Sequence, residues 1–233
     1  MAAAIRDAAS DADVETLRRL LAEGVSPDAT DFNTFIYGAN TALHYLCRWE
    51  ANNCAADDRV ACIKLLIDAG ANLEAVDLNG YTPLQFAANF ANAEIVSLLV
   101  DAGANVNAVT NYGSTALHLA ASDCVEVLLA AGADIDVRDN SGRTPFDNAL
   151  SSDERRAWPL FLRAGAELPA AAENPGQIWF QNPYIVRVRN AGGFKKYEQA
   201  HITRITAILA QTQHLPPEMV RKIVEFWLHA GYY

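Results

Sequence analysis

LLVDAGAN, residues 98–105, is the stretch that decides the fold, because close copies of it recur along the chain. LLIDAGAN ends at Asn72, LLAAGAD ends at Asp134, and LFLRAGAE ends at Glu167. The glycines of the four phrases are separated by 33, 29 and 33 residues; they are Gly70, Gly103, Gly132 and Gly165. A period of this size predicts a stacked array, since one such unit cannot bury its apolar face alone.

A second phrase follows twelve residues after each of the first three glycines. It reads Thr82-Pro83-Leu84-Gln85, Thr115-Ala116-Leu117-His118 and Thr144-Pro145-Phe146-Asp147. The threonine is a good N-cap, and a proline suits the first helical position because its missing N–H is not needed there. A second helix carries an apolar stripe, such as Ile95, Leu98 and Leu99, and the glycine ends it in a left-handed conformation. Each unit is therefore predicted to run turn, helix, loop, helix.

These phrases resemble the ankyrin repeat over roughly residues 2–168. The resemblance implies an all-α solenoid of about five helix-turn-helix repeats with β-hairpin fingers. We expect the repeats at 1–28, 29–74, 75–107, 108–136 and 137–168, which together form an ankyrin-repeat domain at 1–168. In this family the histidine of the second phrase, here His44 and His118, has a structural role. We interpret both in that way, because Gln85 and Asp147 occupy the equivalent positions.

The pattern is interrupted between Gly24 and Thr41, where the finger is five residues longer than the equivalent twelve. This finger contains Phe32, Phe35 and Tyr37, large apolar side chains that a loop rarely carries unless they contact something. Two interpretations remain open: these side chains fold back over the first repeat, or they form part of a partner site. An insertion at 48–58 predicts a solvated loop between two helices.

In ankyrin proteins the recognition surface is concave and is made by finger tips and the exposed ends of first helices. The matching positions are aromatic in the first half of this chain, and small and polar, with two arginines, in the second half. Exposed aromatic residues are typical of interface hot spots. The candidate partner-binding residues are Phe32, Phe35, Tyr37, Arg48, Trp49, Leu78, Tyr81, Asn89, Phe90, Asn111, Tyr112, Arg138 and Arg143. The alternative is that Trp49 and Phe90 only pack on the solenoid.

Charge and composition limit the classes of partner. Residues 1–175 contain 11 Lys and Arg against 25 Asp and Glu, a net charge of −14, whereas residues 176–233 contain 7 against 3, a net charge of +4. An acidic array argues against nucleic-acid binding, which needs a basic face. No apolar run approaches the roughly 18 residues of a membrane span, and the first residues lack a basic n-region, so we expect no membrane partner and no secretory signal. Four cysteines without C-x-x-C spacing favour a reducing compartment, the cytoplasm, with the nucleus as the alternative.

The sequence contains no P-loop, no G-x-G-x-x-G, no H-E-x-x-H and no G-x-S-x-G motif. His201, His214 and His229 are scattered outside the repeats, and Cys54 with Cys62 alone does not make a metal site. We therefore expect no enzymatic activity, no cofactor and no metal ion.

The repeat pattern ends after residue 168. Residues 169–193 predict a linker and a short extended segment, in which Tyr184, Val186 and Val188 alternate with Ile185, Arg187 and Arg189. Residues 194–233 predict a helix pair, whose first helix spans about 194–211 with Ile202, Ile205, Ile208 and Leu209 on one face. A pair of this kind would cap the open end of the last repeat.

The last predicted helix begins with Leu215-Pro216-Pro217-Glu218, which resembles the start of an F-box over 215–227. The resemblance implies docking of a Skp1-like adaptor through Leu215, Pro216, Glu218, Met219, Ile223 and Trp227. The sequence stops at Tyr233, before the two further helices of a full F-box, which favours the cap. A SOCS-box resemblance is weaker, because the expected cysteine of its first helix is missing.

Taken at sequence level, the chain is predicted to be a monomeric, non-enzymatic scaffold that binds a partner protein on its concave ankyrin surface. The alternative is a substrate-recognition subunit of a cullin-type ubiquitin ligase, with the repeats selecting the substrate. A purely structural spacer is the third hypothesis.

Overall fold

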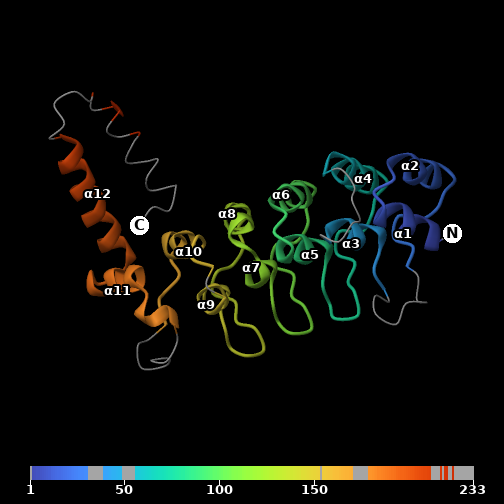
Figure 1. The fold of residues 1–233 in the computed structure, drawn as a ribbon. Coiled ribbons are helices and arrows are strands. Elements are labelled where there is room, and N and C mark those ends of the chain that lie inside the picture. Colours follow the sequence, from blue (N-terminus) through green and yellow to red (C-terminus); the bar gives the residue numbers. More distant parts are fainter. Residues whose placement is uncertain are drawn as a thin grey trace. The chain divides into compact units, whose positions relative to one another are not determined.

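The computed structural model describes residues 2–30, 39–48, 56–152, 154–169, 178–210, 216, 218–219 and 222. Within these ranges the secondary structure is helical, and no strand occurs there. The prediction of an all-α fold is therefore confirmed. The chain divides into two compact units, Met1–Asn148 and Ala149–Tyr233, which are described separately below (Figure 1).

The first unit is built from successive helix pairs that stack in two layers (Figure 1). In one layer α1 packs on α3, α3 on α5 and α5 on α7, and in the other α2 packs on α4 and α6 on α8. The loops that connect successive pairs project on the side of the first layer. The bounds of these helices are α1 (Ala2–Ser10), α2 (Val14–Ala22), α3 (Ala42–Cys47), α4 (Ala56–Asp68), α5 (Pro83–Asn89), α6 (Ala93–Asp101), α7 (Ala116–Leu119) and α8 (Ser122–Ala130). Helix α9 (Pro145–Ser151) begins in the first unit and ends in the second.

Four helices begin at a threonine that forms a reciprocal capping arrangement with the residue three positions later. At α5 the Thr82 hydroxyl accepts from the Gln85 N–H at 3.4 Å, and the Gln85 side-chain oxygen accepts from the Thr82 N–H at 2.8 Å. Such a box satisfies two of the backbone donors that a helix start leaves open. The four pairs are Thr41–His44, Thr82–Gln85, Thr115–His118 and Thr144–Asp147. The predicted helix starts are confirmed.

A second set of hydrogen bonds links each helix pair of the array to the next. The bonded residues lie shortly after the glycines that end the second helices. The Asn72 N–H donates to the Asp28 carboxylate at 2.8 Å, and the Asn105 N–H donates to the Glu74 carboxylate at 2.8 Å. One step further along, the Asp134 N–H donates to the Asn107 side chain at 2.9 Å. Equivalent positions therefore make equivalent contacts, which is what a regular stack requires.

The core of the first unit lies between the two helix layers. Its fully buried side chains include many leucines and isoleucines, such as Leu43, Ile63, Leu84, Ile95 and Leu99. The alanines of the first helices, such as Ala87 and Ala88, are also buried and allow close helix packing. Buried thiols complete this core: Cys47, Cys62 and Cys124 are not disulfide-bonded, and burial raises the pKa of the Cys124 thiol to about 11. These thiols act as small apolar side chains.

The second unit contains α10 (Trp158–Ala164), the 3₁₀ helix η1 (Ile178–Gln181), α11 (Pro183–Asn190) and α12 (Phe194–Ala210). Within this unit α11 packs on η1 and α12, and α10 packs on α12 (Figure 1). The ion pair between Arg163 and Glu198, at 3.2 Å, joins α10 to α12. The helix predicted at about 194–211 is present as α12.

The prediction of a short extended segment before this helix is wrong, because Pro183–Asn190 forms the helix α11. The side chains of α11 alternate in polarity only in part. Its two buried side chains, Ile185 and Val188, stand three positions apart, which places them on one face of a helix. The local signals also favour a helix. Asn182 is the N-cap and accepts from the Tyr184 N–H at 2.9 Å, and Pro183 takes the first helical position.

The division between the two units falls inside the fifth expected repeat, 137–168, which contains α9 and α10. The domain limits expected at 168 and 193, and the number of repeats, stay predictions. The β-hairpin form of the fingers also stays a prediction.

Candidate interaction surface

Three projecting loops, 77–81, 110–114 and 139–143, share one internal construction. In the first loop the Asp77 carboxylate accepts from the N–H groups of Asn79 and Tyr81, both at 2.8 Å. The Thr110 hydroxyl and the Asp139 carboxylate do the same in the other two loops. Each loop is also closed by backbone hydrogen bonds, such as that from the Asp77 N–H to the Tyr81 carbonyl at 3.0 Å. Short polar side chains of this kind hold a turn in one conformation.

The three loops are hydrogen-bonded to one another in a row. The Asn111 N–H donates to the Asn79 carbonyl at 3.0 Å, and the Asn140 N–H donates to the Tyr112 carbonyl at 2.9 Å. The side-chain amide of Asn111 also donates to the Leu78 carbonyl, at 3.2 Å, and that of Asn140 donates to the Asn111 carbonyl, at 3.0 Å. Asn111 and Asn140 therefore fasten each loop to its neighbour, and the row behaves as one preformed surface.

Two histidines that take part in the helix caps, His44 and His118, also hydrogen-bond to the loops. The Thr41 N–H donates to His44 Nδ1 at 3.1 Å, so Nδ1 is unprotonated, and the ring donates from Nε2 to the Tyr81 carbonyl at 3.0 Å. His118 makes the equivalent pair of bonds with Thr115 and Arg143, at 3.1 and 3.0 Å. Burial lowers the pKa of both imidazoles, which keeps them neutral. The structural role expected for His44 and His118 matches these contacts.

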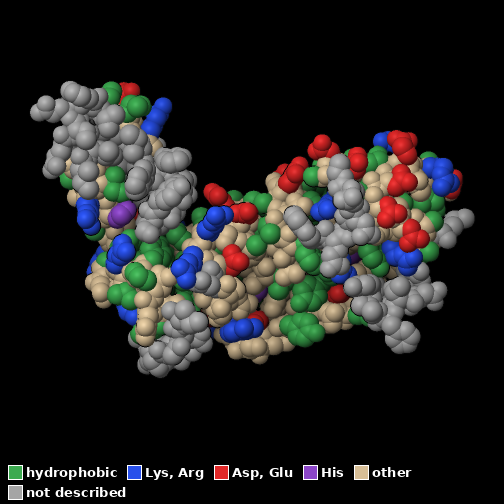
Figure 2. Space-filling model, in the orientation of Figure 1, with side chains coloured by type: hydrophobic (Ala, Val, Ile, Leu, Met, Phe, Trp, Pro, Cys, Tyr) green, Lys and Arg blue, Asp and Glu red, His purple; other side chains and the backbone are tan. Residues whose placement is uncertain are grey.

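An aromatic cluster lies on this side of the first unit, and Phe86 is at its centre. Its ring centroid is 5.6 Å from that of Tyr81 and 6.3 Å from that of Phe90, which it stacks at an interplanar angle of 9°. Tyr81 in turn lies 6.5 Å from Tyr112. Leu78 and Tyr112 are 62% and 55% exposed, respectively. Figure 2 shows hydrophobic side chains gathered over the projecting loops, whereas acidic side chains gather over the layer of second helices.

Two arginines belong to the third loop or adjoin it: Arg138 directly precedes the loop and Arg143 is its last residue. Arg138 donates to the Gly142 carbonyl at 2.7 Å, and Arg143 forms an ion pair with Asp139 at 3.1 Å. Burial alone would raise the pKa of Asp139, but the N–H groups of Arg143 and Ser141 and the Arg143 guanidinium together lower it. Both arginines keep exposed side chains. We call the group formed by Leu78, Tyr81, Phe86, Phe90, Tyr112, Arg138 and Arg143 the finger surface.

The predicted partner-binding residues are distributed as follows. Those that are exposed are Leu78, Asn89, Asn111, Tyr112, Arg138 and Arg143, and those that are half-buried are Arg48, Tyr81 and Phe90. Phe32, Phe35, Tyr37 and Trp49 lie outside the described residues. The structure brings the loop residues together with Phe90, whereas Arg48 is the C-cap of α3 and Asn89 ends α5. Of the predicted adaptor-binding residues, Pro216, Glu218 and Met219 are exposed, and Leu215, Ile223 and Trp227 lie outside the described residues.

Phe86 is the member of the finger surface that sequence reasoning missed. Its signal was present, because Phe86 and Phe90 stand four positions apart and so share a helix face. That face adjoins the aromatic finger residue Tyr81, as the stacked and tilted ring contacts show.

The described residues provide neither a metal site nor a membrane-spanning helix. No group of three or more His, Cys, Asp or Glu side chains in these ranges could hold a metal ion. No helix in the described part of the chain is both long and apolar enough to cross a membrane.

Comparison with known proteins agrees with the repeated helix pairs and their threonine caps. Residues 3–107 and 52–139 match the family described as ankyrin repeats in three copies, and the match spans more than half of the chain. The chain belongs to the ankyrin-repeat family. The ankyrin match accounts for the first unit up to the third loop, where the finger surface ends.

Two curated proteins are similar to parts of this ankyrin-repeat chain. Glycerophosphocholine phosphodiesterase gde1 of Schizosaccharomyces pombe is 37% identical over 135 residues, 58% of this chain. ADP-ribosylation factor GTPase-activating protein AGD4 of Arabidopsis thaliana is 38% identical over 59 residues, 25% of this chain. The alignment covers 8% of the length of each relative, so the likeness concerns a small part of these proteins.

Proposed function

We propose that this ankyrin-repeat protein is an interaction scaffold that binds a protein partner on the finger surface. The observation that carries the proposal is the cluster of exposed and half-buried apolar side chains, with Leu78, Tyr81 and Tyr112 on hydrogen-bonded loops and Phe86 and Phe90 at α5. Leu78 and Tyr112 are each more than half exposed, and large apolar groups at such exposure are typical of contact sites. Tyr is also among the residues most enriched at hot spots.

The rigidity of the loops supports the same proposal. Binding by a flexible loop loses affinity because the loop must be ordered, at about 0.5–1.5 kcal/mol for each side chain that becomes fixed. Here the loops are already fixed by Asp77, Thr110 and Asp139 within each turn, and by Asn111 and Asn140 between turns. A partner would therefore meet a surface that needs little rearrangement.

The test is affinity capture from native cytosol, comparing the wild type with the double variant Leu78→Ala/Tyr112→Ala. A matched control, Lys64→Ala/Glu126→Ala, changes two exposed residues on the second helices α4 and α8. A partner of the finger surface should be retained by the control and bind the loop variant at least about tenfold more weakly. A partner that both variants capture equally well would place the interaction elsewhere and would contradict the proposal.

The alternative function is a ubiquitin-ligase substrate receptor that recruits a Skp1-like adaptor through 215–227. It is supported by the exposure of Pro216, Glu218 and Met219, since a docking helix must present such residues to its partner. A truncation that ends at Gln213 separates the two functions. Loss of adaptor and cullin with the truncation, and no loss with the finger variant, would favour this alternative.

The remaining properties of the scaffold are part of the same proposal. We infer a monomer in the cytoplasm, without nucleic-acid or membrane partners and without catalytic activity of its own. The acidic balance of the first unit supports the exclusion of nucleic acid, because residues 1–148 contain 8 Lys and Arg against 21 Asp and Glu.

A further inference from the structure

The exposed apolar side chains of the first unit are concentrated at two neighbouring loops. Leu78 and Tyr112 lie on the loops 77–81 and 110–114, and Val76 and Val109 stand directly before these loops or one position before Thr110. Their exposed fractions are 50% for Val76, 62% for Leu78, 56% for Val109 and 55% for Tyr112. No other large apolar side chain among the described residues of this unit is exposed to this degree. Apolar contact with a partner is therefore available mainly at these two loops.

The third loop carries positive charge where the first two loops are apolar. Val76, Val109 and Arg138 each stand six residues after the glycine that ends the second helix of their repeat, so they occupy equivalent positions. Tyr81 and Arg143 are equivalent in the same way, eleven residues after that glycine. The loops are hydrogen-bonded to one another in sequence, so equivalent positions follow one another along the row. The row therefore changes from apolar to cationic along its length.

The exposed charges of the stretches 76–81, 109–114 and 138–143 are the two arginines. These stretches also contain Asp77 and Asp139, but both carboxylates are engaged inside their own loops. Asp77 accepts from two backbone N–H groups at 2.8 Å, and Asp139, which is buried, accepts from two at 2.8 and 3.0 Å. The acids of the first unit gather instead over the second helices (Figure 2). A partner at the third loop therefore meets positive charge, although the unit as a whole is acidic.

The two arginines differ in how their charge is balanced. Arg143 forms an ion pair with Asp139 at 3.1 Å. Arg138 donates to the Gly142 carbonyl at 2.7 Å, and it forms no ion pair within the part of the chain that the structure describes. A carbonyl is uncharged, so it positions the guanidinium without neutralising it, and further N–H groups of Arg138 remain for an acceptor. Arg138 is the cation that can bind an acid of the partner.

We propose that the finger surface, together with Val76 and Val109, binds a polypeptide segment that combines apolar side chains with an acidic one. The apolar side chains contact the first two loops. A carboxylate of Asp or Glu binds the Arg138 guanidinium, whose planar set of donors matches the two carboxylate oxygens. A basic segment would place a like charge against Arg138, so the charge selects among apolar segments. This inference rests on the proposed scaffold function and adds the chemistry of the partner to it.

The test uses a phage-displayed library of random linear peptides, selected against the full 233-residue chain. The peptides retained are those that bind the Lys64→Ala/Glu126→Ala control and lose binding in Leu78→Ala/Tyr112→Ala. We expect them to contain apolar residues accompanied by Asp or Glu, and to bind more weakly as the NaCl concentration rises, because salt screens an exposed charge pair. Retained peptides that lack acidic residues, or that are basic, overturn the proposal.

Charge variants locate the acidic contact. Arg138→Gln should weaken the best peptide about threefold, and Arg138→Glu at least about tenfold, because an exposed ion pair is weak but a reversed charge adds repulsion. Replacing the acid of the peptide by its amide should weaken binding to the wild type more than binding to Arg138→Gln, as two residues in contact require. Arg18→Gln is the matched control, since it makes the same change at an exposed arginine of α2, and it should leave the affinity unchanged. Circular dichroism of the variants checks that the helices remain.

The outcomes separate this proposal from the scaffold function. Peptides that need Leu78 and Tyr112 but bind Arg138→Glu as tightly as the wild type overturn the acidic contact and leave the scaffold function in place. Failure to enrich any peptide that depends on Leu78 and Tyr112 also overturns the proposal, because the proposal requires a linear segment. The scaffold function is then decided by the capture experiment, in which a folded partner can bind.

Discussion

His44 and His118 are the residues whose chemistry is most tightly set by their surroundings. Each ring accepts at Nδ1 from a threonine N–H and donates from Nε2 to a carbonyl of the next loop, which defines one neutral tautomer. Burial lowers the pKa of both rings below the ordinary value of 6.5. Protonation at Nδ1 would place a hydrogen against the threonine N–H, so the charged form is incompatible with the helix cap.

This arrangement predicts that the protein loses stability in mild acid. Below pH 6.5 the unfolded chain binds protons at His44 and His118 that the folded chain does not, so the free energy of unfolding falls as the pH falls. The limiting slope is about 1.4 kcal/mol per pH unit for each histidine. Urea unfolding at pH 7.5, 6.5 and 5.5 measures it. The fall stops once the pH passes below the lowered folded-state pKa values.

The control for this prediction is already present in the chain, because Gln85 makes the same two kinds of bond at the equivalent position. The variant His44→Gln/His118→Gln should therefore remain folded and lose less stability than the wild type between pH 7.5 and 5.5. At pH 7.5 it should be less stable by only about 1 kcal/mol, since His44 loses an edge contact with Phe86. Every other ionisable group is the same in both proteins and cancels in the difference. Parallel pH profiles would contradict the assignment.

At the scale of the loop, the contact between neighbouring fingers predicts that two similar glycines differ in their tolerance of alanine. Gly113 and Gly142 have nearly the same left-handed backbone, with φ values of +75° and +78°. A Cβ at Gly113 would lie 2.6 Å from the Asn140 side-chain oxygen and 3.0 Å from its backbone nitrogen, whereas a Cβ at Gly142 would meet nothing within 4 Å. Gly142→Ala should destabilise the protein by about 1–2 kcal/mol, from backbone strain alone.

Gly113→Ala should cost at least about 1 kcal/mol more, because the loop beside it must also move. Chemical denaturation measures both costs. Hydrogen exchange at the Asn140 amide, which donates to the Tyr112 carbonyl, measures the contact itself and should accelerate in Gly113→Ala alone. Equal costs for the two substitutions, with unchanged exchange at Asn140, would show that the loops do not support one another.

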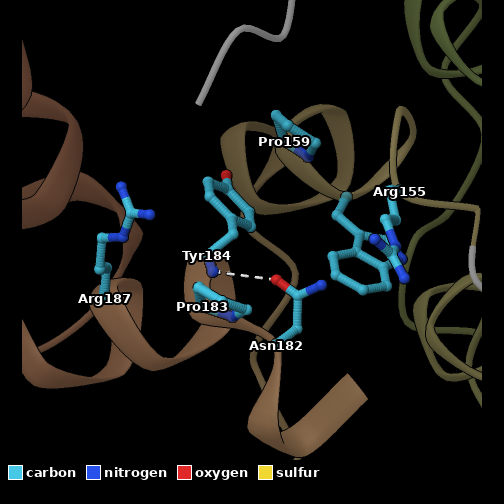
Figure 3. Close-up of a pocket in the computed structure, with 7 residues that line it drawn as sticks. Arg155, Pro159, Asn182, Pro183, Tyr184 and Arg187 are labelled. Atoms are coloured by element: carbon cyan, nitrogen blue, oxygen red, sulfur yellow. Dashed lines mark hydrogen bonds between the residues drawn. The ribbon is translucent and has the colours of Figure 1, made fainter. Parts of the chain in front are cut away.

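Most of the helices and loops could be predicted from the sequence. Threonine, proline and glycine recur at equivalent positions of the repeats, so the sequence predicted where the helices start and which residues form the loops. The position of Leu78 and Tyr112 on the loops followed from this spacing. Helix α11 did not follow, because Pro183–Asn190 lies outside the period and a short run with partial alternation is ambiguous between strand and helix. The pocket that Arg155 and Arg187 help to line (Figure 3) could not be predicted either, because these two residues stand 32 positions apart, one inside the fifth expected repeat and the other beyond the repeats.

On the scale of the whole molecule, the charge is divided between the two units. Residues 1–148 contain 8 Lys and Arg against 21 Asp and Glu, a net charge of −13, and residues 149–233 contain 10 against 7, a net charge of +3. In the first unit the acidic side chains gather over the second helices (Figure 2). The ion pair of Arg19 with Glu23 on α2 is exposed, and pairs of this kind contribute little stability.

Repulsion among these acids predicts that salt stabilises the protein. Like charges on one compact unit oppose folding, and the Debye length shortens from about 30 Å at 10 mM to about 3 Å at 1 M, so added chloride salt screens the repulsion. The midpoint of thermal unfolding should therefore rise between about 10 mM and about 0.5 M NaCl. The variant Asp101→Asn/Glu126→Gln, which removes two exposed acids from α6 and α8 away from the helix N-termini, should be more stable than the wild type at low salt and should gain less from added salt. If the wild type is instead destabilised by salt, attractive pairs dominate the first unit and the repulsion argument is wrong.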